Sequence, residues 1–262
     1  FENNKLIWAK NFKVPFRSNL KVYKNKLILS NQDNKLFFIN KKNGEKIKII
    51  PTEQVILKNS FVNSLAIKND DLFFLNNYGT LYSINADNGK INWFLNLNQL
   101  INSRSNNLFF SNPVIIYKEK IIVSSDPNLF ILDKNTGKIE HKSTITSIIK
   151  PVTIKENIFF ITKKNLLVCL DLITGKIVYS INISQLIAEY LDTKEKLIDI
   201  KSATILNNEL FIFLKNSYYI RYNLLGKIED IQKLKSSINS DLIFVDDSIA
   251  FLNKKNKLII IN

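Results

Sequence analysis

The chain has 262 residues, 45% of them hydrophobic and 23% charged, and its formal net charge is +14 at pH 7. This length supports one large domain with a sizeable core, and the abundance of Ile, Phe, Leu and Tyr excludes a disordered chain. No apolar run approaches the length of a membrane-spanning helix, and no signal-like segment opens the chain.

The chain starts at Phe1 and contains no Met, so we expect the natural N-terminus, with any leader or anchor, to lie outside this sequence. The positive charge is carried mostly by Lys residues spread through turns, and the arginines are Arg17, Arg104 and Arg221. A nucleic-acid site would gather basic residues on one element. The composition therefore predicts a solvated basic surface and no nucleic-acid partner.

The first predicted element, NNKLIWAKNF at residues 3–12, matches NGKINWFLNL at residues 88–97 with Trp8 aligned to Trp93. The chain therefore starts on a strand of the same kind as the one that holds Trp93. The last predicted element, NKKNKLIIIN at residues 253–262, matches NKLFFIN at residues 34–40.

Between these ends, hairpins of two β-rich runs about a short polar turn recur along the chain. They are predicted at residues 22–30, 66–76, 115–125, 153–162, 204–214 and 243–253.

A second kind of turn follows five of these hairpins. A strand-like run leads into a polar turn that ends in Gly, and a further strand-like run follows at residues 34–50, 79–95, 128–143, 165–180 and 217–232. The glycines recur about every 45 residues, and a tight bulged hairpin needs the positive φ that Gly adopts without strain. These glycines are Gly44, Gly89, Gly137, Gly175 and Gly226.

Hairpin, third strand, Gly turn and fourth strand make a four-stranded antiparallel unit of about 40 residues, which is a β-propeller blade. We predict an all-β fold in which residues 1–262 form a single, monomeric propeller domain. It has five complete blades and one blade split between the N-terminal and C-terminal ends. The first strand either seals a six-bladed ring, or the chain is part of a longer propeller.

Two insertions interrupt the repeat, at residues 98–107 and 184–202. In the second, Leu186, Ile187, Tyr190 and Leu191 recur at helical spacing, which predicts a short amphipathic helix. Such a helix either lies only on its own propeller or offers a partner-docking surface, because loops that follow fourth strands gather on one face. The predicted partner-binding residues are Leu100, Arg104, Leu186 and Tyr190.

Groups with catalytic or metal-binding potential are few. The only cysteine, Cys169, lies in a strand pattern and is predicted to be a buried, inert thiol, and the only histidine, His141, is predicted to be a solvated side chain on a fourth strand. No Gly-rich phosphate loop occurs. The remaining candidates sit in turns, where Asp caps its own backbone: Asp70, Asp71, Asp133, Asp171, Asp246 and Asp247. No catalytic, metal or cofactor site is therefore predicted.

The phrase LYSINADNGKINW (81–93), with weaker copies LFILDKNTGKIEH (129–141) and LVCLDLITGKIVY (167–179), resembles the PQQ-like β-propeller repeat. In that family a Trp packs flat between neighbouring blades, and Trp8 and Trp93 match it. The equivalent positions elsewhere are Lys48, His141, Tyr179 and Asp230, so other side chains must make most blade contacts.

That family contains quinone-dependent dehydrogenases and non-catalytic scaffolds, the best known of which are the BamB-type lipoproteins of outer-membrane β-barrel assembly. The chain is most similar to the scaffolds in size and in its insertions. The resemblance implies a periplasmic, outer-membrane-associated protein that binds the central subunit of the barrel-assembly machine. Such scaffolds are lipid-anchored and eight-bladed, whereas this chain has fewer blades and no lipobox cysteine near its start. We therefore expect a C-terminal portion of a longer protein.

Two other functions stay open. A quinone-dependent dehydrogenase-like propeller would need acidic and amide calcium ligands and commonly a vicinal cysteine pair, which a single Cys cannot supply. A sensor ectodomain of a membrane protein would need a spanning helix upstream of this sequence.

Overall fold

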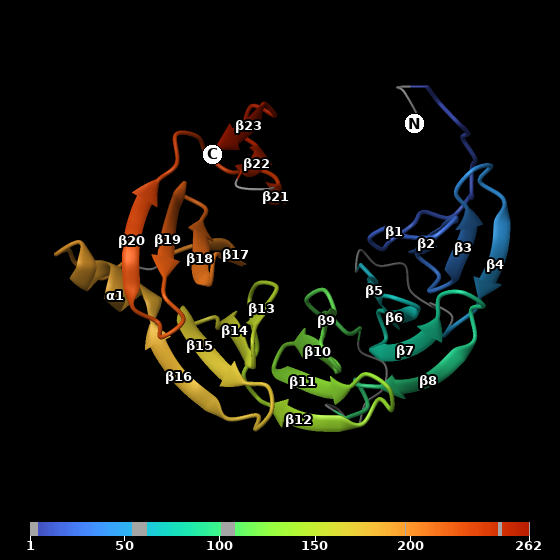
Figure 1. The fold of residues 1–262 in the computed structure, drawn as a ribbon, viewed down its shortest axis with the longest axis horizontal. Helices are drawn as coiled ribbons and strands as arrows, with labels where there is room; N and C mark the ends of the chain where they lie inside the picture. The colour runs from blue at the N-terminus through green and yellow to red at the C-terminus, as the bar shows by residue number, and fades with distance from the viewer. Residues whose placement is uncertain (1–4, 54–61, 101–107, 197, 246–247, 262) are drawn as a thin grey trace. The chain divides into compact units, whose positions relative to one another are not determined.

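The fold is described from a computed structural model that covers residues 5–53, 62–100, 108–196, 198–245 and 248–261. Contacts divide the chain into two compact units, Phe1–Thr144 (unit 1) and Ile145–Asn262 (unit 2). Each unit is built of antiparallel sheets whose strands lie side by side in chain order (Figure 1). The prediction of one propeller domain over residues 1–262 stays a prediction.

Within its described residues, unit 1 contains three four-stranded sheets. The first is β1 (Lys21–Tyr23), β2 (Lys26–Ser30), β3 (Leu36–Asn40) and β4 (Lys46–Ile50). The second is β5 (Ser64–Lys68), β6 (Asp71–Leu75), β7 (Thr80–Asn85) and β8 (Ile91–Asn96). The third is β9 (Ile115–Tyr117), β10 (Lys120–Ser125), β11 (Asn128–Asp133) and β12 (Ile139–Ser143).

The described part of unit 2 contains two four-stranded sheets, one three-stranded sheet and a helix. The strands are β13 (Val152–Ile154), β14 (Asn157–Ile161), β15 (Leu166–Asp171) and β16 (Ile177–Asn182), then β17 (Ile200–Leu206), β18 (Glu209–Leu214), β19 (Tyr218–Tyr222) and β20 (Ile228–Lys233). The last sheet is β21 (Ile243–Val245), β22 (Ser248–Leu252) and β23 (Leu258–Ile261). Helix α1 (Ile183–Tyr190) joins β16 to β17.

The predicted hairpins and Gly turns are confirmed. The five turn glycines have φ between +68° and +85°. In all five hairpins the pairing register shifts by a bulge where the third strand nears the turn, as between Ser83 and Ile84 and between Arg221 and Tyr222. All-β propeller blades, five with four strands and one with three, therefore account for nearly the whole described chain.

Polar residues just before each Gly fix these turns. In the third sheet, Asp133 Oδ1 accepts hydrogen bonds from the backbone N–H groups of Asn135 and Thr136, at 3.1 and 2.8 Å, and from Thr136 Oγ1 at 2.8 Å. Asp171 does the same for Ile173 and Thr174. Turn chemistry is thus confirmed for both carboxylates.

Trp8 and Trp93 have matching surroundings in unit 1. Trp8 Nε1 donates to the carbonyl oxygen of Lys41 at 2.8 Å, and a Cβ built on Gly44 would lie 2.6 Å from the Trp8 ring. Trp93 Nε1 donates to the carbonyl oxygen of Lys134 at 3.2 Å. Each indole thus caps the Gly turn of the following sheet, and only Gly leaves room for the ring.

Other residues take the same place at two further Gly turns, as expected for Lys48 and Tyr179. The Lys48 side chain lies over Gly89 and donates to its carbonyl oxygen at 3.0 Å. In unit 2, the Tyr179 ring lies over Gly226, and its hydroxyl donates to the carbonyl oxygen of Leu224 at 3.0 Å.

One strand prediction is wrong in part. Residues 6–12 form no regular strand, although residues 3–12 were expected to form one. A strand requires a ladder of backbone hydrogen bonds to a neighbouring strand. The residues around Trp8 match those around Trp93 and make the same indole contact, but residues 6–12 have no such ladder. Completion of the β21–β23 sheet by this segment stays a prediction.

Hydrophobic side chains from facing sheets form the cores of each unit. In unit 1 one cluster joins the first and second sheets, around Phe38 and Phe74, and another joins the second and third, around Phe73 and Phe130. In unit 2 the main cluster joins the sheets β13–β16 and β17–β20 and includes Cys169. In the described residues, no helix is long and apolar enough to cross a membrane.

Candidate partner-binding surface

One end of the sheets in unit 2 carries the helical insertion. In an antiparallel sheet of four strands, the turn between the second and third strands lies at the same end as the exit of the fourth. Ile183 N–H donates to the carbonyl oxygen of Asn165 in the β14–β15 turn at 3.0 Å, and Lys215 N–H donates to the carbonyl oxygen of Asp199 at 2.9 Å. We call this end the connection end of unit 2, formed by residues 162–165, 183–196, 198–199 and 215–217.

Helix α1 begins and ends through local hydrogen bonds. Asn182 is its N-cap, and its side chain accepts from the backbone N–H groups of Ser184 and Gln185 at 3.0 and 3.2 Å, which satisfies donors that a helix start leaves unpaired. The helix ends at Tyr190, and Asp192 follows with φ of +49°. The predicted amphipathic helix is therefore confirmed.

The helix divides its apolar side chains between the sheets and solvent. Leu186 and Ile187 are half-buried against the main core cluster of unit 2. Tyr190 and Leu191 remain 50% and 47% exposed. Helix α1 thus lies on its own propeller, and its last residue Tyr190 and the following Leu191 still present large apolar side chains to solvent. The sequence pattern could not separate these pairs, because all four share one face.

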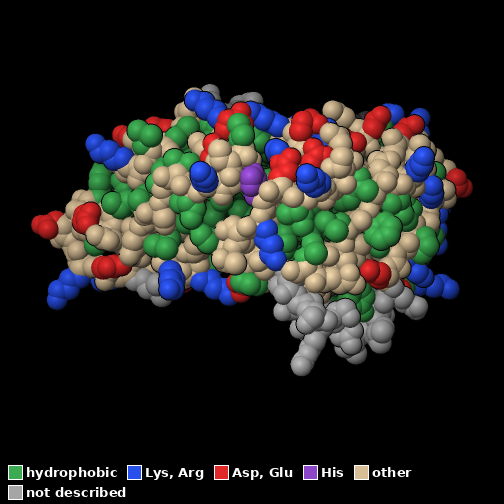
Figure 2. Space-filling model, turned by 90° about the horizontal axis from the view of Figure 1, so that it is seen from below, with side chains coloured by type: hydrophobic (Ala, Val, Ile, Leu, Met, Phe, Trp, Pro, Cys, Tyr) green, Lys and Arg blue, Asp and Glu red, His purple; other side chains and the backbone are tan. Residues whose placement is uncertain are grey.

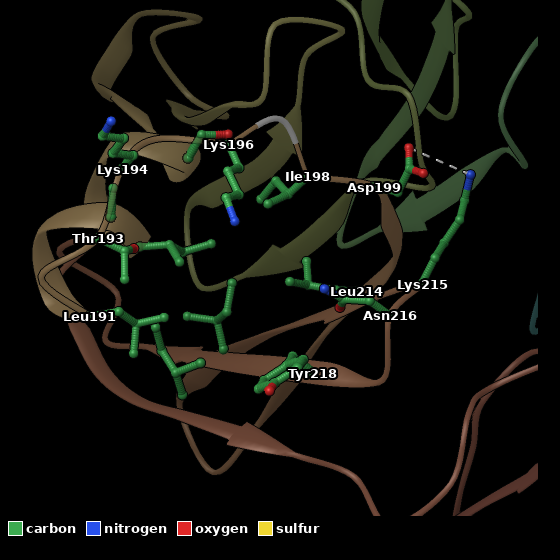
Figure 3. Close-up of a pocket in the computed structure, with 15 residues that line it drawn as sticks. Leu191, Thr193, Lys194, Lys196, Ile198, Asp199, Leu214, Lys215, Asn216 and Tyr218 are labelled. Carbon is green, nitrogen blue, oxygen red and sulfur yellow. Dashed lines mark ion pairs between the residues drawn. The ribbon is translucent and has the colours of Figure 1, made fainter.

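A pocket of about 620 Å³ lies between α1, the segment after it and the sheet β17–β20 (Figure 3). This volume is in the range of small-molecule and side-chain pockets in proteins. Its apolar lining comes from the helix side and from the strands: Ile187, Ala188, Leu191, Ile198, Leu214, Tyr218, Ile220 and Ile231.

The charged residues of this lining are Lys194, Lys196, Asp199 and Lys215. Lys215 Nζ and Asp199 Oδ1 form a long ion pair of 3.9 Å, drawn as a dashed line in Figure 3. Among the described residues, neither Lys194 nor Lys196 has a hydrogen bond or ion pair from its ammonium group. The lining therefore carries excess positive charge beside an apolar interior.

The other predicted insertion belongs to unit 1. Leu100 is 45% exposed, and its carbonyl oxygen accepts a hydrogen bond from Lys142 Nζ at 2.9 Å. Arg104 lies outside the described residues. Partner binding by Leu100, Arg104, Leu186 and Tyr190 stays a prediction.

The described residues that were considered for catalysis do not line this pocket. Cys169 is a free, buried thiol, and burial raises its pKa to about 11, as expected for an inert core residue. His141 is half-buried on β12 rather than fully solvated. Asp70 accepts a hydrogen bond from the Tyr23 hydroxyl, and Asp71 pairs with Lys134 at 3.2 Å. Asp246 and Asp247 lie outside the described residues.

No group of three or more His, Cys, Asp or Glu side chains suited to a metal ion occurs in the part of the chain that the structure describes. The Thr136 hydroxyl and backbone N–H groups lower the pKa of Asp133, which fits its turn role. Figure 2 shows Lys and Arg side chains scattered among acidic and hydrophobic ones over one face of the molecule.

A family model described as outer membrane protein assembly factor BamB matches residues 1–180. The chain belongs to this family. The match spans more than half of the chain and includes all the sheets of unit 1 as well as β13–β15 and most of β16. No curated protein sequence matches the chain.

Solved structures agree on the fold. BamB from Moraxella catarrhalis is similar with a TM-score of 0.56 at 11% identity, covering 97% of this chain and 85% of that protein. The computationally designed protein Ika8 is similar with a TM-score of 0.55 at 9% identity, covering 95% and 96%. A natural assembly factor and a designed protein match about equally well, so these likenesses show the fold alone.

Sequence reasoning missed most of the pocket. Leu214, Tyr218 and Ile231 lie at strand positions that read as ordinary core residues, and only the packing of the insertion over β17–β20 leaves a hollow above them. The one available signal was the insertion itself, because a segment longer than a simple connection needs something to pack on.

Proposed function

We propose that the chain is a non-catalytic scaffold that mediates protein–protein interaction in the assembly of outer-membrane β-barrel proteins. The observation that carries the proposal is the match of residues 1–180 to the BamB family. The stacked sheets supply rigid geometry, and the connection segments supply exposed apolar side chains for contacts with a partner.

The proposed partner is the central subunit of the barrel-assembly machine. The proposed contacts are the two insertions, through Leu100 and Arg104 in one and Tyr190 in the other. Tyrosine and arginine side chains at the centre of an interface can supply much of the binding energy, and a neighbouring leucine can pack around them. The protein acts in the periplasm, in association with the outer membrane and as a monomeric propeller.

Affinity capture with the purified central subunit tests this role. We expect the full chain to bind, and Leu100→Glu combined with Arg104→Glu to weaken binding at least about tenfold, a loss typical of interface anchors. Leu225→Glu is the matched control, because Leu225 is 85% exposed in a Gly turn at the opposite end of its sheet. Absence of a complex, with or without chemical crosslinking, would refute the proposal.

The proposal includes no catalytic step. It is supported by the roles that the acidic and thiol groups already have in turns, ion pairs and the core. Reconstitution with pyrroloquinoline quinone and calcium, followed by absorbance spectroscopy, checks this point. Saturable uptake of the quinone would favour the dehydrogenase-like alternative instead.

A further inference from the structure

The pocket beside α1 has features that the general scaffold role leaves unexplained. An insertion that only bridged β16 and β17 could pack flat on the strand ends. Instead, Ile187 and Leu191 from the helix side line a pocket of about 620 Å³ together with Leu214 and Tyr218 from the strands. Apolar walls in water favour occupation by another apolar group.

The charged side chains of the pocket lining indicate which charge a bound group should carry. Lys215 has Asp199 as a counter-ion, at 3.9 Å. Figure 3 shows the Lys196 side chain reaching toward the interior of the pocket, whereas Lys194 points away from it. Because Lys196 has no ionic partner among the described residues, an occupant with an anionic group beside its apolar part is complementary to the site.

The rim extends this apolar surface beyond the pocket. Tyr190 and Leu191, which are 50% and 47% exposed, continue it onto the outside of α1. A small amphiphile inside the pocket would leave the exposed face of Tyr190 uncovered. A protein segment can fill the pocket with one side chain and cover the rim with its neighbours, which is the usual arrangement of an interface anchor and its surroundings.

We propose that this pocket docks an acidic segment of a partner protein, which inserts one large apolar side chain between α1 and the ends of β18 and β19 and pairs a carboxylate with Lys196. The proposal deepens the scaffold role and rests on it. Ile187, Leu191 and Tyr218 contact the inserted side chain, and Tyr190 contacts the flanking residues.

A random peptide library displayed on phage and selected on the full chain tests the proposal for a partner of any identity. We expect enriched peptides to carry Phe, Leu, Ile or Trp within two positions of Asp or Glu. Synthetic copies should bind the Lys196→Glu and Leu191→Ser variants at least about tenfold more weakly. Both positions are exposed at the surface, so the variants keep the core intact.

Matched controls separate the pocket from general charge and hydrophobicity. Lys164→Glu makes the same charge change on an exposed side chain at the connection end, in the β14–β15 turn outside the pocket lining. Leu225→Ser makes the same apolar-to-polar change at a residue that is 85% exposed in a Gly turn. Both controls should bind the peptides within about twofold of the unchanged chain.

Three results would overturn the proposal: no enrichment, enriched peptides without the acidic and apolar pair, or equal binding to the variants and controls. Titration with dodecanoate forms a separate arm, and binding of this free carboxylate without any enriched peptide would assign the pocket to a small amphiphile. If enriched peptides meet the criteria but the chain does not bind the central barrel subunit, the assembly role is refuted and the docking pocket is supported. If the chain binds that subunit but no such peptides are enriched, only the docking pocket is refuted.

Discussion

Substitution of Gly137 by Ala tests the contact that joins the second and third sheets. Gly137 has φ of +73°, and a Cβ there would lie 2.7 Å from Trp93 Cε3 and 2.9 Å from Trp93 Cδ2. An L-residue at such a φ costs about 1–2 kcal/mol. Displacing a packed ring by one methyl group adds about 1–3 kcal/mol. We expect the free energy of unfolding to fall by about 2–5 kcal/mol.

Gly89→Ala is the matched control, because it has the same turn and nearly the same φ, +68°. Its new Cβ would meet Lys48, with Cδ at 2.8 Å and Nζ at 3.2 Å. A lysine side chain on the surface can change rotamer and exchange its hydrogen bonds to Asn88 and Gly89 for bonds to water at little net cost. The half-buried Trp93 indole, packed in the core and bonded to Lys134, cannot move in this way. Only the backbone cost of about 1–2 kcal/mol should remain.

Urea denaturation followed by circular dichroism measures both free energies. Replacing Trp93 by Lys first, which copies the Lys48 arrangement, should reduce the cost of Gly137→Ala to that of Gly89→Ala. Equal losses for the two Gly→Ala variants in the unchanged chain would refute the reasoning. So would a loss at Gly137 that is insensitive to the Trp93 substitution.

Three further outcomes are expected. Tyr179→Phe should lower the free energy of unfolding by about 1 kcal/mol, since it removes the hydrogen bond to Leu224 and keeps the ring; an unchanged urea midpoint would contradict this. The folded pKa of Asp133 is lowered by its hydrogen bonds, so its stabilisation is complete above the unfolded pKa of about 4 and is lost as pH falls through the folded value. Any excess in the free energy of unfolding of the unchanged chain over Asp133→Asn should therefore disappear at acid pH. An excess that grows as the pH falls would contradict the direction of the pKa shift. Cys169, buried and with a pKa raised to about 11, should resist iodoacetamide at neutral pH until urea is added, as mass spectrometry can measure; rapid alkylation of the native chain would contradict its burial.

The blades were predictable because their signals are local. Alternating apolar residues define strands, and Gly after Asn, Thr or Leu marks a turn that needs positive φ, as at Gly89 and Gly226. The helix was predictable for the same reason, because Leu186, Ile187 and Tyr190 share one face within two turns. Even the Trp8 contact followed from its alignment with Trp93, although residues 6–12 form no regular strand.

The candidate pocket was not predictable in this way. Its wall brings Ile187 and Leu191 together with Leu214, Tyr218 and Ile231, and no local pattern states that the helix and these strand ends enclose a space. The direction of the Lys196 side chain is equally invisible in the sequence, where it is one Lys among many (Figure 3).

Sequence alone determined the hairpins, the turns that connect their strands and the presence of a helix, because hydrogen-bonding geometry and side-chain periodicity act between near neighbours. Tertiary structure decided which apolar side chains of that helix became core, which stayed exposed, and where a hollow lined by a lysine ammonium group remained. The exposure of these side chains and the shape of the pocket depend on the volumes and positions of groups that are distant along the chain. They are therefore set only when the insertion packs against the sheets.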